Sequence, residues 1–408
     1  MRNMKEKKNP KYIKKANTFV YILLRAIFRP ALYLLYRFKF DYITSKAITC
    51  PCLILSNHQT VFDQFAVGLG FSFGINYIAS DTLFRRGLLS WFMKALGRPI
   101  PFSKGNSDLI AVKNIMSVIK SGGAVGMFPS GNRSFYGEES TIAKGIGKLA
   151  KKLNVPLVLV RMHGGFNVKP RWKAKPNRGE MRAGVVRVVS REELTALSHE
   201  EADELIHNEL YFNEFEFNRT AKLVYTGQHK AEYLESVLFY CPQCNSMESL
   251  YSQGNEFLCR ACNMKVRIGE TGFLEKVTNA YKIPDTILEW SRIQINYIKK
   301  HDFSVYTEKP AFRDNNTVFT KAERAKKETS LGKGTIEFFA DKMSICGHDF
   351  LFTETTWAVQ GVRKLTVYNK GNVYAINGPY RINFMKYMIC GYHLRNKFLG
   401  ITEEYYGY

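Results

Sequence analysis

The segment NHQTVFD, residues 57–63, places a histidine and an aspartate directly after the apolar run CLIL. A histidine that is oriented by a carboxylate is the usual general base near neutral pH. Five positions along a continuous helix correspond to a rotation of about 140°, so the two side chains would not share a face of it. We therefore expect His58 to lie in the turn before a helix that carries Asp63. A lone pair of this kind more often has a structural role, so its interpretation depends on the other motifs.

Basic residues follow two other strand-like runs. The segment FPSGNRS, residues 128–134, comes after an apolar run and carries Gly131, Asn132 and Arg133. Glycine permits close approach of the backbone to a ligand, and the planar guanidinium of arginine suits a phosphate or a carboxylate. Lys104 follows the run PIPF in the same way. Together these groups could hold an anionic substrate beside the base, although Arg133 alone would more often be a surface or ion-pair arginine.

The elements that must position these groups alternate between strand-like and helical patterns. Runs rich in Val, Ile and Leu predict strands at 52–56, 75–80, 98–102, 124–130, 155–163 and 181–190. Apolar residues at helical spacing predict helices at 80–97, 107–123 and 141–154, the first two with capping signals at both ends. Ser198 and Glu201 form a capping box before a further acidic helix. The alternation predicts an α/β domain with a mostly parallel sheet, whose ligands lie at strand ends.

Four motifs in order resemble those of the lysophosphatidic acid acyltransferase (PlsC-like) family of glycerolipid acyltransferases. They are the pair within NHQTVFD, Lys104 after PIPF, FPSGNRS and VPLVLV, and they agree over roughly residues 20 to 220. The resemblance implies transfer of a fatty acyl group from acyl-CoA or an acyl-carrier protein to a lysophospholipid in phospholipid synthesis. The expected acceptor is 1-acyl-sn-glycerol-3-phosphate, and no organic cofactor is implied beyond the thioester donor.

The resemblance also implies roles for individual residues. His58 would remove the proton of the acceptor hydroxyl while Asp63 orients the imidazole, so that the alcohol attacks the thioester without an acyl-enzyme. The acceptor phosphate would be bound by Lys104, Gly131, Asn132 and Arg133.

The sequence departs from the family pattern at three positions. Ser130 stands where the family usually has glutamate, Lys104 where it often has arginine, and Leu159 where a second proline is common. The lost glutamate leaves the identity of the acceptor open, whereas neither His58 nor Asp63 is affected. Downstream, the basic segment 164–182 could face anionic headgroups or the phosphates of the donor, or be a solvated loop.

The N-terminal 45 residues combine a basic tail with an apolar, aromatic stretch. Within residues 16–40, Arg25, Arg29 and Pro30 interrupt the apolar pattern, so we expect two short amphipathic helices at a membrane interface and no spanning helix. The lysines before this stretch would be attracted to anionic lipid by roughly 1 kcal/mol each. This predicts a peripheral or monotopic protein at the cytoplasmic face of the membrane. The alternative is a helix pair that covers the core behind a disordered tail.

Two C-x2-C pairs, separated by fourteen residues, predict a zinc ribbon. A hairpin in the spacer would bring together four thiolates around a tetrahedral Zn²⁺ with no open position, which is typical of a structural site. The proposed ligands are Cys241, Cys244, Cys259 and Cys262. The first residues of the sequence are a basic run and do not have the pattern of a secretory signal, so reduced thiols and a cytoplasmic location are expected. The remaining cysteines are interpreted as small buried hydrophobes: Cys50, Cys52, Cys346 and Cys390.

The last part of the chain is rich in predicted antiparallel strands. After a helical linker at 285–301, alternating patterns predict strands within 303–309, 334–346, 348–361, 363–378 and 380–385, followed by a helix at 385–400. This outline is similar to pleckstrin-homology-like domains. The predicted organisation is therefore a tail and interfacial helices (1–45), an acyltransferase domain (46–230), a zinc ribbon (236–272) and a β-rich domain (280–408).

Composition limits the functional alternatives. The chain has 408 residues, 45% hydrophobic and 23% charged, which excludes a disordered protein, and its net charge of +23 favours an anionic partner. Three alternatives to the predicted enzyme stay open: a different glycerolipid acceptor, a catalytically weak lipid-binding protein of the same fold, and a zinc-ribbon nucleic-acid-binding protein. We expect membrane lipid and no nucleic acid, because the charge is spread over the N-terminal arm and the loops of the α/β domain.

Overall fold

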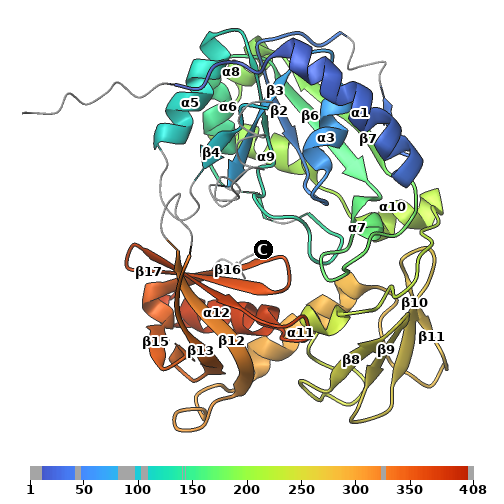
Figure 1. The fold of residues 1–408 in the computed structure, drawn as a ribbon, viewed down its shortest axis with the longest axis vertical. Helices are drawn as coiled ribbons and strands as arrows, with labels where there is room; N and C mark the ends of the chain where they lie inside the picture. Colours follow the sequence, from blue (N-terminus) through green and yellow to red (C-terminus); the bar gives the residue numbers. More distant parts are fainter. Residues whose placement is uncertain are drawn as a thin grey trace, which may run out of the picture.

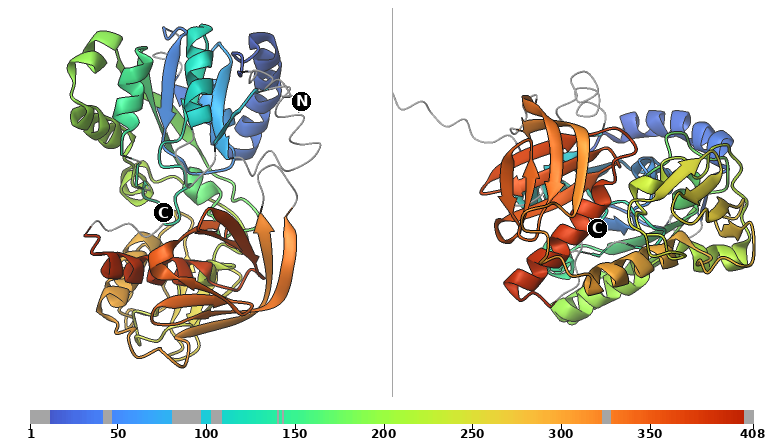
Figure 2. Two further views of the ribbon diagram at one scale, coloured as in Figure 1. Left: turned by 90° about the vertical axis from the view of Figure 1, so that its left-hand side faces the viewer. Right: turned by 90° about the horizontal axis from the view of Figure 1, so that it is seen from below.

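The computed structural model describes residues 12–41, 47–80, 97–102, 109–139, 141–142, 144–322 and 328–402. They form an α/β domain, a small four-stranded ribbon and a C-terminal β-domain closed by a helix (Figures 1 and 2). In Figure 1 the two smaller units lie on the side of the α/β domain toward which the strands β2 and β6 run.

The α/β domain is built on a seven-stranded sheet with the order β1-β7-β6-β2-β5-β3-β4. All neighbours pair in parallel except β6 and β7, which confirms the predicted mostly parallel sheet. The strands are β1 (Lys39–Asp41), β2 (Cys52–Ser56), β3 (Ile75–Ser80), β4 (Ile100–Phe102), β5 (Ala124–Met127), β6 (Leu157–His163) and β7 (Arg182–Val189). The helices are α1 (Thr18–Tyr36), α3 (Asp63–Leu69), α5 (Leu109–Lys120), α6 (Ile146–Leu153), α7 (Gly165–Val168), α8 (Arg191–Ala196), α9 (His199–Leu210) and α10 (Glu214–Ala221).

Alternate residues of the central strands face two separate hydrophobic cores. In β2, Cys52 and Ile54 pack with α1 and α3, whereas Leu53 and Leu55 pack with α5, α6 and α9. Figure 1 shows these two helix layers on opposite faces of the sheet. Burial on both faces explains why the strand reads as a continuous apolar run. The domain thus has three layers, with the sheet between two layers of helices. The polar residues that follow β2 lie at the carboxyl end of this strand, at one edge of the domain.

The N-terminal stretch is one helix, so the prediction of two short helices was wrong. Helix α1 continues through Pro30, which lies on its exposed side, where water can satisfy the carbonyl that the proline leaves without a donor. In the part of the chain that the structure describes, α1 is the single helix long and apolar enough to cross a membrane by length and composition. One face of α1 packs on α3, with Phe28 stacked on Phe65 at 4.0 Å. The opposite face carries most of its exposed apolar side chains: Phe19, Ile22, Leu23, Ile27, Tyr33, Leu34 and Leu35.

The ribbon contains the antiparallel sheet β11-β10-β9-β8. Its strands are β8 (Leu250–Gln253), β9 (Glu256–Cys259), β10 (Lys265–Ile268) and β11 (Leu274–Lys276), and the short helix η2 (Leu234–Ser236) precedes them. The β8–β9 hairpin occupies the spacer between the two cysteine pairs, as predicted. Helix α11 (Ile287–Lys300) then leads to the C-terminal β-domain, close to the expected bounds of the linker helix.

The C-terminal β-domain is a seven-stranded antiparallel sheet with the order β15-β14-β13-β12-β18-β17-β16. Its elements are β12 (Phe312–Ala322), β13 (Thr329–Phe338), β14 (Lys342–Ile345), β15 (His348–Leu351), η3 (Phe352–Glu354), β16 (Thr355–Gln360), β17 (Lys364–Asn369), β18 (Asn372–Asn377) and α12 (Phe384–Leu399). The predictions of strands at 303–309 and 380–385 were wrong. Asn383 instead caps α12, accepting a 2.7 Å hydrogen bond from the backbone of Lys386. Strand β12 was not predicted, and its pairing with β13 is interrupted at Asn315 and Asn316 by a β-bulge.

A single hydrophobic cluster connects the three units. It contains Phe135 and Phe166 of the α/β domain, Phe257 of the ribbon, Trp290 of α11 and Trp357 of the C-terminal β-domain. Buried apolar surface of this kind favours one fixed arrangement over independent movement of the units.

Candidate active site

His58 and Asp63 form a hydrogen-bonded pair at the carboxyl end of β2. His58 lies in the turn between β2 and α3, and Asp63 is the first residue of α3, as their spacing required. Nδ1 of His58 lies 2.7 Å from Oδ2 of Asp63. The Asp63 side chain is fully buried, whereas 20% of the His58 side chain is exposed. A substrate can therefore reach the ring while its carboxylate partner is shielded from water.

The Asp63 carboxylate also organises the turn that carries His58. It accepts hydrogen bonds from the backbone N–H of Gln59 at 2.6 Å, and from the N–H and the hydroxyl of Thr60 at 2.9 and 2.6 Å. Its place in the first turn of α3 puts the negative charge at a helix N-terminus, where charge of this sign is stabilised. At the strand end, Asn57 exchanges two 2.8 Å hydrogen bonds with the backbone of Met162 in β6. Both ends of the turn are thus fixed.

The protonation state of His58 follows from these surroundings. Because Asp63 accepts from Nδ1–H, the neutral ring has its lone pair on Nε2. Burial lowers the pKa of His58 below its ordinary value of 6.5, although Asp63 raises it, and the charges of Arg133 and Arg171 lower it further. The ring also stacks on Phe128, with centroids 4.4 Å apart. His58 is therefore neutral at pH 7 and can accept a proton at Nε2.

The FPSGNRS segment packs directly against this turn. The N–H of Ser134 donates to the carbonyl of His58 at 3.0 Å. The N–H of Gly131 donates to the carbonyl of Phe128 at 2.9 Å. Gly131 has a φ of 63°, a conformation that glycine adopts without strain. Arg133 is close enough for its charge to act on the imidazole. Among the described residues its guanidinium has no hydrogen bond or ion pair, so it is available to an anionic ligand.

The other predicted phosphate ligands differ in what the structure describes. Gly131 and Asn132 lie in the same turn as Arg133, and the carbonyl of Asn132 accepts a 3.1 Å hydrogen bond from the hydroxyl of Ser130. The serine that replaces the family's glutamate is thus engaged within the loop. Lys104 lies outside the described residues.

A buried polar network behind the turn was not predicted. Nε2 of Gln59 donates to the carbonyl of Met162 at 2.9 Å and to Oε1 of Glu214 at 2.7 Å. Glu214 is fully buried, and its Oε2 accepts from the N–H of Gly164 at 2.7 Å. A Cβ on the next residue, Gly165, would lie 2.6 Å from Oε1 of Gln59, so the backbone approaches this side chain closely. The glutamine lies within NHQTVFD, but its glutamate partner is remote in sequence and no local pattern indicates the contact.

The basic segment 164–182 also contributes Arg171 to this region. Nη1 of Arg171 donates to the carbonyl of Arg133 at 2.8 Å. The neighbouring Trp172, by contrast, is buried in the shared core, and its Nε1 donates to the carbonyl of Lys230 at 3.3 Å. Composition identified the segment, but only packing separates the residue beside the site from the residue in the core.

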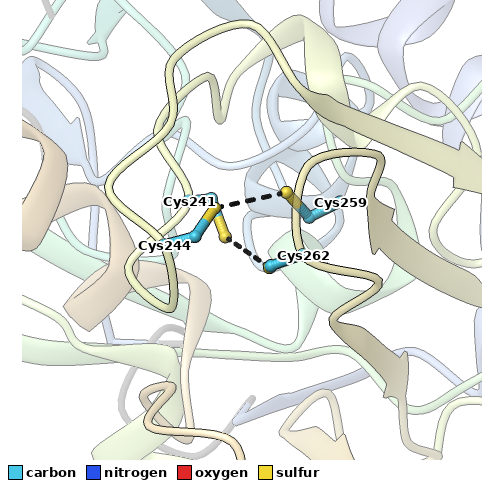
Figure 3. A group of neighbouring side chains, drawn as sticks. All are labelled: Cys241, Cys244, Cys259 and Cys262. Atoms are coloured by element: carbon cyan, nitrogen blue, oxygen red, sulfur yellow. Dashed lines mark hydrogen bonds between the residues drawn. The ribbon is translucent and has the colours of Figure 1, made fainter.

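Four cysteine sulfurs converge between the two knuckles of the ribbon (Figure 3). They lie within 4.8 Å of one another, with 3.8 Å between Cys241 and Cys262 and 3.7 Å between Cys244 and Cys259. Four Zn–S bonds of about 2.3 Å in a tetrahedron would place the sulfurs about 3.8 Å apart. The spacing therefore fits a bound metal ion with four thiolate ligands.

The two knuckles share one local geometry. The N–H of Cys241 donates to the carbonyl of Ser246, and that of Cys259 donates to the carbonyl of Met264, five residues later in each case. An asparagine with positive φ follows the second cysteine of each pair, in CPQCN and in CRACN. Asparagine tolerates this conformation better than most residues, so the repeat was a further sequence signal for two matched knuckles.

One thiol of the cluster is prepared for metal binding by its neighbours. Burial opposes ionisation of Cys259, but the hydroxyl of Ser249, 3.1 Å from its sulfur, and the backbone of its own knuckle lower its pKa to about 7. A thiolate is the form that binds metal ions.

A match to a known protein family lies within the α/β domain. Residues 39–163 match the family model described as Acyltransferase. The 1-acyl-sn-glycerol-3-phosphate acyltransferase BAT2, chloroplastic, of Brassica napus is 30% identical over 141 residues, which cover 34% of this chain and 39% of the relative. The 1-acyl-sn-glycerol-3-phosphate acyltransferase of Saccharomyces cerevisiae is 29% identical over 150 residues, 36% of this chain and 49% of the relative. This chain thus spans less than half the length of either relative.

A solved structure aligns with slightly less than half of the chain. The crystal structure of the 1-acyl-sn-glycerophosphate (LPA) acyltransferase PlsC from Thermotoga maritima has a TM-score of 0.41 and 19% sequence identity, and the alignment covers 47% of this chain and 77% of that chain. Residues 39–163 of this chain are therefore an Acyltransferase domain by the family match, and the chain is similar over about a third of its length to 1-acyl-sn-glycerol-3-phosphate acyltransferases.

Proposed function

We propose that this protein transfers a fatty acyl group from acyl-CoA or an acyl-carrier protein to the hydroxyl of a lysophospholipid. The observation that carries the proposal is the hydrogen bond between His58 and the buried Asp63, with Nε2 of the ring left free. Nε2 takes the proton of the acceptor hydroxyl, and the oxygen attacks the thioester carbonyl. The C–O bond forms, the C–S bond breaks, and the imidazolium returns its proton to the leaving thiolate. Asp63 stabilises the imidazolium between the two transfers.

The proposed acceptor carries a phosphate, with 1-acyl-sn-glycerol-3-phosphate as the first candidate. Arg133 is close to His58 and has no described side-chain partner, which supports a role in binding an anion. Gly131 and Asn132 would complete this side of the phosphate site, and Lys104 is proposed as a further ligand on sequence grounds. The names of the relatives from Brassica napus and Saccharomyces cerevisiae support the same acceptor.

We further propose that α1 docks the protein on the cytoplasmic face of a membrane, lying in the interface. Its inner face is occupied by α3 and the residues that flank it, since Tyr36 contacts Phe62 just before α3 and Arg25 donates to the carbonyl of Phe71 just after it. A helix held along one side by its own domain suits an interfacial position better than a spanning one. Because Phe62 lies within the turn that joins His58 to Asp63, lipid at α1 would be close to the site.

We propose a structural role for the cysteine cluster and a docking role for the C-terminal β-domain. The proposed ion is Zn²⁺, which four thiolates in a tetrahedron favour, and with no open ligand position it would hold the ribbon together. In the C-terminal β-domain, the four strands β12 to β15 and the three strands β16 to β18 join where β12 pairs with β18, and α12 follows them. This strand order supports the resemblance to pleckstrin-homology-like domains.

Replacement of His58 by alanine is expected to reduce acyl transfer about 10² to 10⁴-fold, because a general base contributes a factor of this size. The substrates are 1-acyl-sn-glycerol-3-phosphate and either acyl-CoA or acylated acyl-carrier protein. A thiol reagent follows the release of free thiol, and mass spectrometry follows the formation of the acylated lipid. Turnover equal to that of the wild type would remove His58 from the mechanism. A wild type that binds vesicles but forms no product with any lysolipid would indicate a lipid-binding protein.

Replacement of Asp63 by asparagine is expected to move the acid limb of kcat/KM to lower pH. The base must be neutral, and burial lowers its pKa below 6.5, so the wild-type limb lies below pH 6.5. Asp63 opposes the effect of burial, and loss of its charge lowers the pKa of His58 further. The rate at the plateau falls as well, because the ring loses its fixed orientation. A limb that moves to higher pH would contradict this account, provided that the variant unfolds at a temperature close to that of the wild type.

Leu34→Glu is expected to weaken binding to anionic vesicles by about tenfold or more, since burial of a leucine side chain is worth about 1.5–3 kcal/mol. Leu34 is 77% exposed on α1. The matched control is Val305→Glu, at a position 67% exposed beyond α11, which should leave binding unchanged. Co-sedimentation with vesicles of phosphatidylcholine and phosphatidylglycerol measures both variants. Equal binding by the two variants and the wild type would exclude α1 as the docking element.

The purified protein is expected to contain about one zinc ion per chain, and Cys244→Ser to lose it together with a fall in unfolding temperature. Cys346→Ser is the matched control, because Cys346 is a half-buried thiol outside the cluster. Metal content by plasma mass spectrometry and thermal unfolding followed by circular dichroism decide the outcome. A wild type without metal that unfolds at the same temperature with and without added zinc would overturn the metal assignment.

A further inference from the structure

One peptide unit at the end of the FPSGNRS segment is held on both sides. Its carbonyl, that of Arg133, accepts a 2.8 Å hydrogen bond from Nη1 of Arg171. Its N–H, that of Ser134, donates to the carbonyl of His58 at 3.0 Å. Because the peptide unit is planar, a rotation that breaks one of these bonds also disturbs the other. The orientation of Arg133 and its distance from His58 therefore both depend on the orientation of the Arg133–Ser134 peptide unit.

Arg171 connects this peptide unit to a different part of the molecule. Its Nη2 donates at 3.0 Å to the carbonyl of Val359, in β16 of the C-terminal β-domain. Strand β16 lies at one edge of its sheet, so among the described residues one of its sides has no strand neighbour and its backbone can accept from a side chain. Figure 1 shows β16 on the side of the C-terminal β-domain that faces the α/β domain. The guanidinium spans the two domains with two nearly equivalent hydrogen bonds.

The surroundings of Arg171 make this an unusual use of a charged side chain. The guanidinium lies over the ring of Phe135, 3.4 Å from its centroid. No carboxylate forms an ion pair with it among the described residues, and burial together with the charge of Arg133 lowers its pKa well below the ordinary value. A buried charge that is balanced only by carbonyl dipoles and a ring is costly to fold. Such a residue is better explained by the geometry that it imposes than by a gain in stability.

We propose that Arg171 is a positioning residue that sets the Arg133–Ser134 peptide against the C-terminal β-domain, so that this domain takes part in binding the acceptor's phosphate. This inference rests on the proposed role of Arg133. A planar fork that reaches two carbonyls at once is required, which arginine provides and lysine does not. The C-terminal β-domain is therefore part of the enzyme's acceptor site and more than an appended docking module.

The interface does not depend on Arg171 alone, which makes the test feasible. The hydroxyl of Tyr136 donates to the carbonyl of Val237 at 3.1 Å, and Glu138 forms a 2.7 Å ion pair with Arg292 of α11. These contacts hold the following segment to the ribbon and to α11. Arg171→Lys is therefore expected to fold with the same arrangement of units. Arg292→Ala is the matched control, because it removes a charged contact of the same segment without touching the Arg133–Ser134 peptide.

The experiment compares Arg171→Lys, Arg171→Met and Arg292→Ala in the full chain, with 1-acyl-sn-glycerol-3-phosphate and, as a phosphate-free acceptor, monoacylglycerol. We expect both Arg171 variants to raise KM for the phosphate-bearing acceptor about tenfold, which corresponds to about 1.4 kcal/mol, with kcat changed less than about threefold. Turnover of monoacylglycerol and all parameters of Arg292→Ala should stay close to those of the wild type. Hydrogen exchange in 131–138 should be faster in the Arg171 variants only.

Unchanged KM and unchanged exchange in Arg171→Lys would overturn the proposal. So would equal changes in Arg171→Lys and Arg292→Ala, because they would show a general effect of the interface. If the wild type acylates no lysolipid, the proposed function fails, and the exchange data alone decide whether Arg171 holds the peptide. Faster exchange limited to the Arg171 variants would then support the coupling of the two domains without the enzymatic role.

Discussion

The carboxylate of Asp63 is the group on which the site depends. It is fully buried, and it accepts hydrogen bonds from two backbone N–H groups, one hydroxyl and the imidazole of His58. A buried carboxylate without such partners would cost several kcal/mol, whereas each hydrogen bond to a charged group is worth about 1.5–3 kcal/mol. The turn from Asn57 to Asp63 therefore adopts a conformation that satisfies this charge. The position of His58 follows from that conformation.

The same constraint explains the chemical state of the histidine. A carboxylate that accepts from Nδ1 fixes the ring orientation and leaves Nε2 with the lone pair, while burial against Phe128 and the nearby arginines favours the neutral form. Opposing effects on the pKa of His58 give an imidazole that is unprotonated at neutral pH and still stabilised when it takes a proton, as the proposed general base requires. Burial alone would destabilise the protonated ring, and the carboxylate alone would raise the pKa of His58.

The remaining units are joined to this centre through the segment that follows FPSGNRS. Ser134 bonds to the His58 turn, Tyr136 to the ribbon and Glu138 to α11, while Phe135 lies in the core shared by all three units. Between the ribbon and the C-terminal β-domain, the buried ammonium of Lys386 pairs with Glu248 and with Asp314. Contacts of this density make the ribbon a rigid connector, and a metal ion at its cysteines would stabilise that connector from within.

Local sequence was sufficient for features that depend on nearby residues. The capping box at Ser198, the knuckles around Cys241 and Cys259, and the placement of His58 in a turn before α3 follow from spacing, side-chain chemistry and helical geometry over a few positions. The alternation of buried strands and amphipathic helices likewise predicted the mostly parallel sheet, because burial on both faces leaves its mark on each strand separately.

Other features needed the folded chain. The sequence could not indicate that Pro30 would lie on the exposed side of a continuous helix, or that Asn315 and Asn316 would form a bulge inside β12. It also could not pair Gln59 with Glu214, since these side chains meet only because β6 and α10 bring them to the same strand end. Sequence alone thus identified the candidate groups for the proposed chemistry and the local turns that present them. Tertiary packing decided which distant polar groups hold those turns, because such contacts depend on burial and distance in space, which local spacing does not encode.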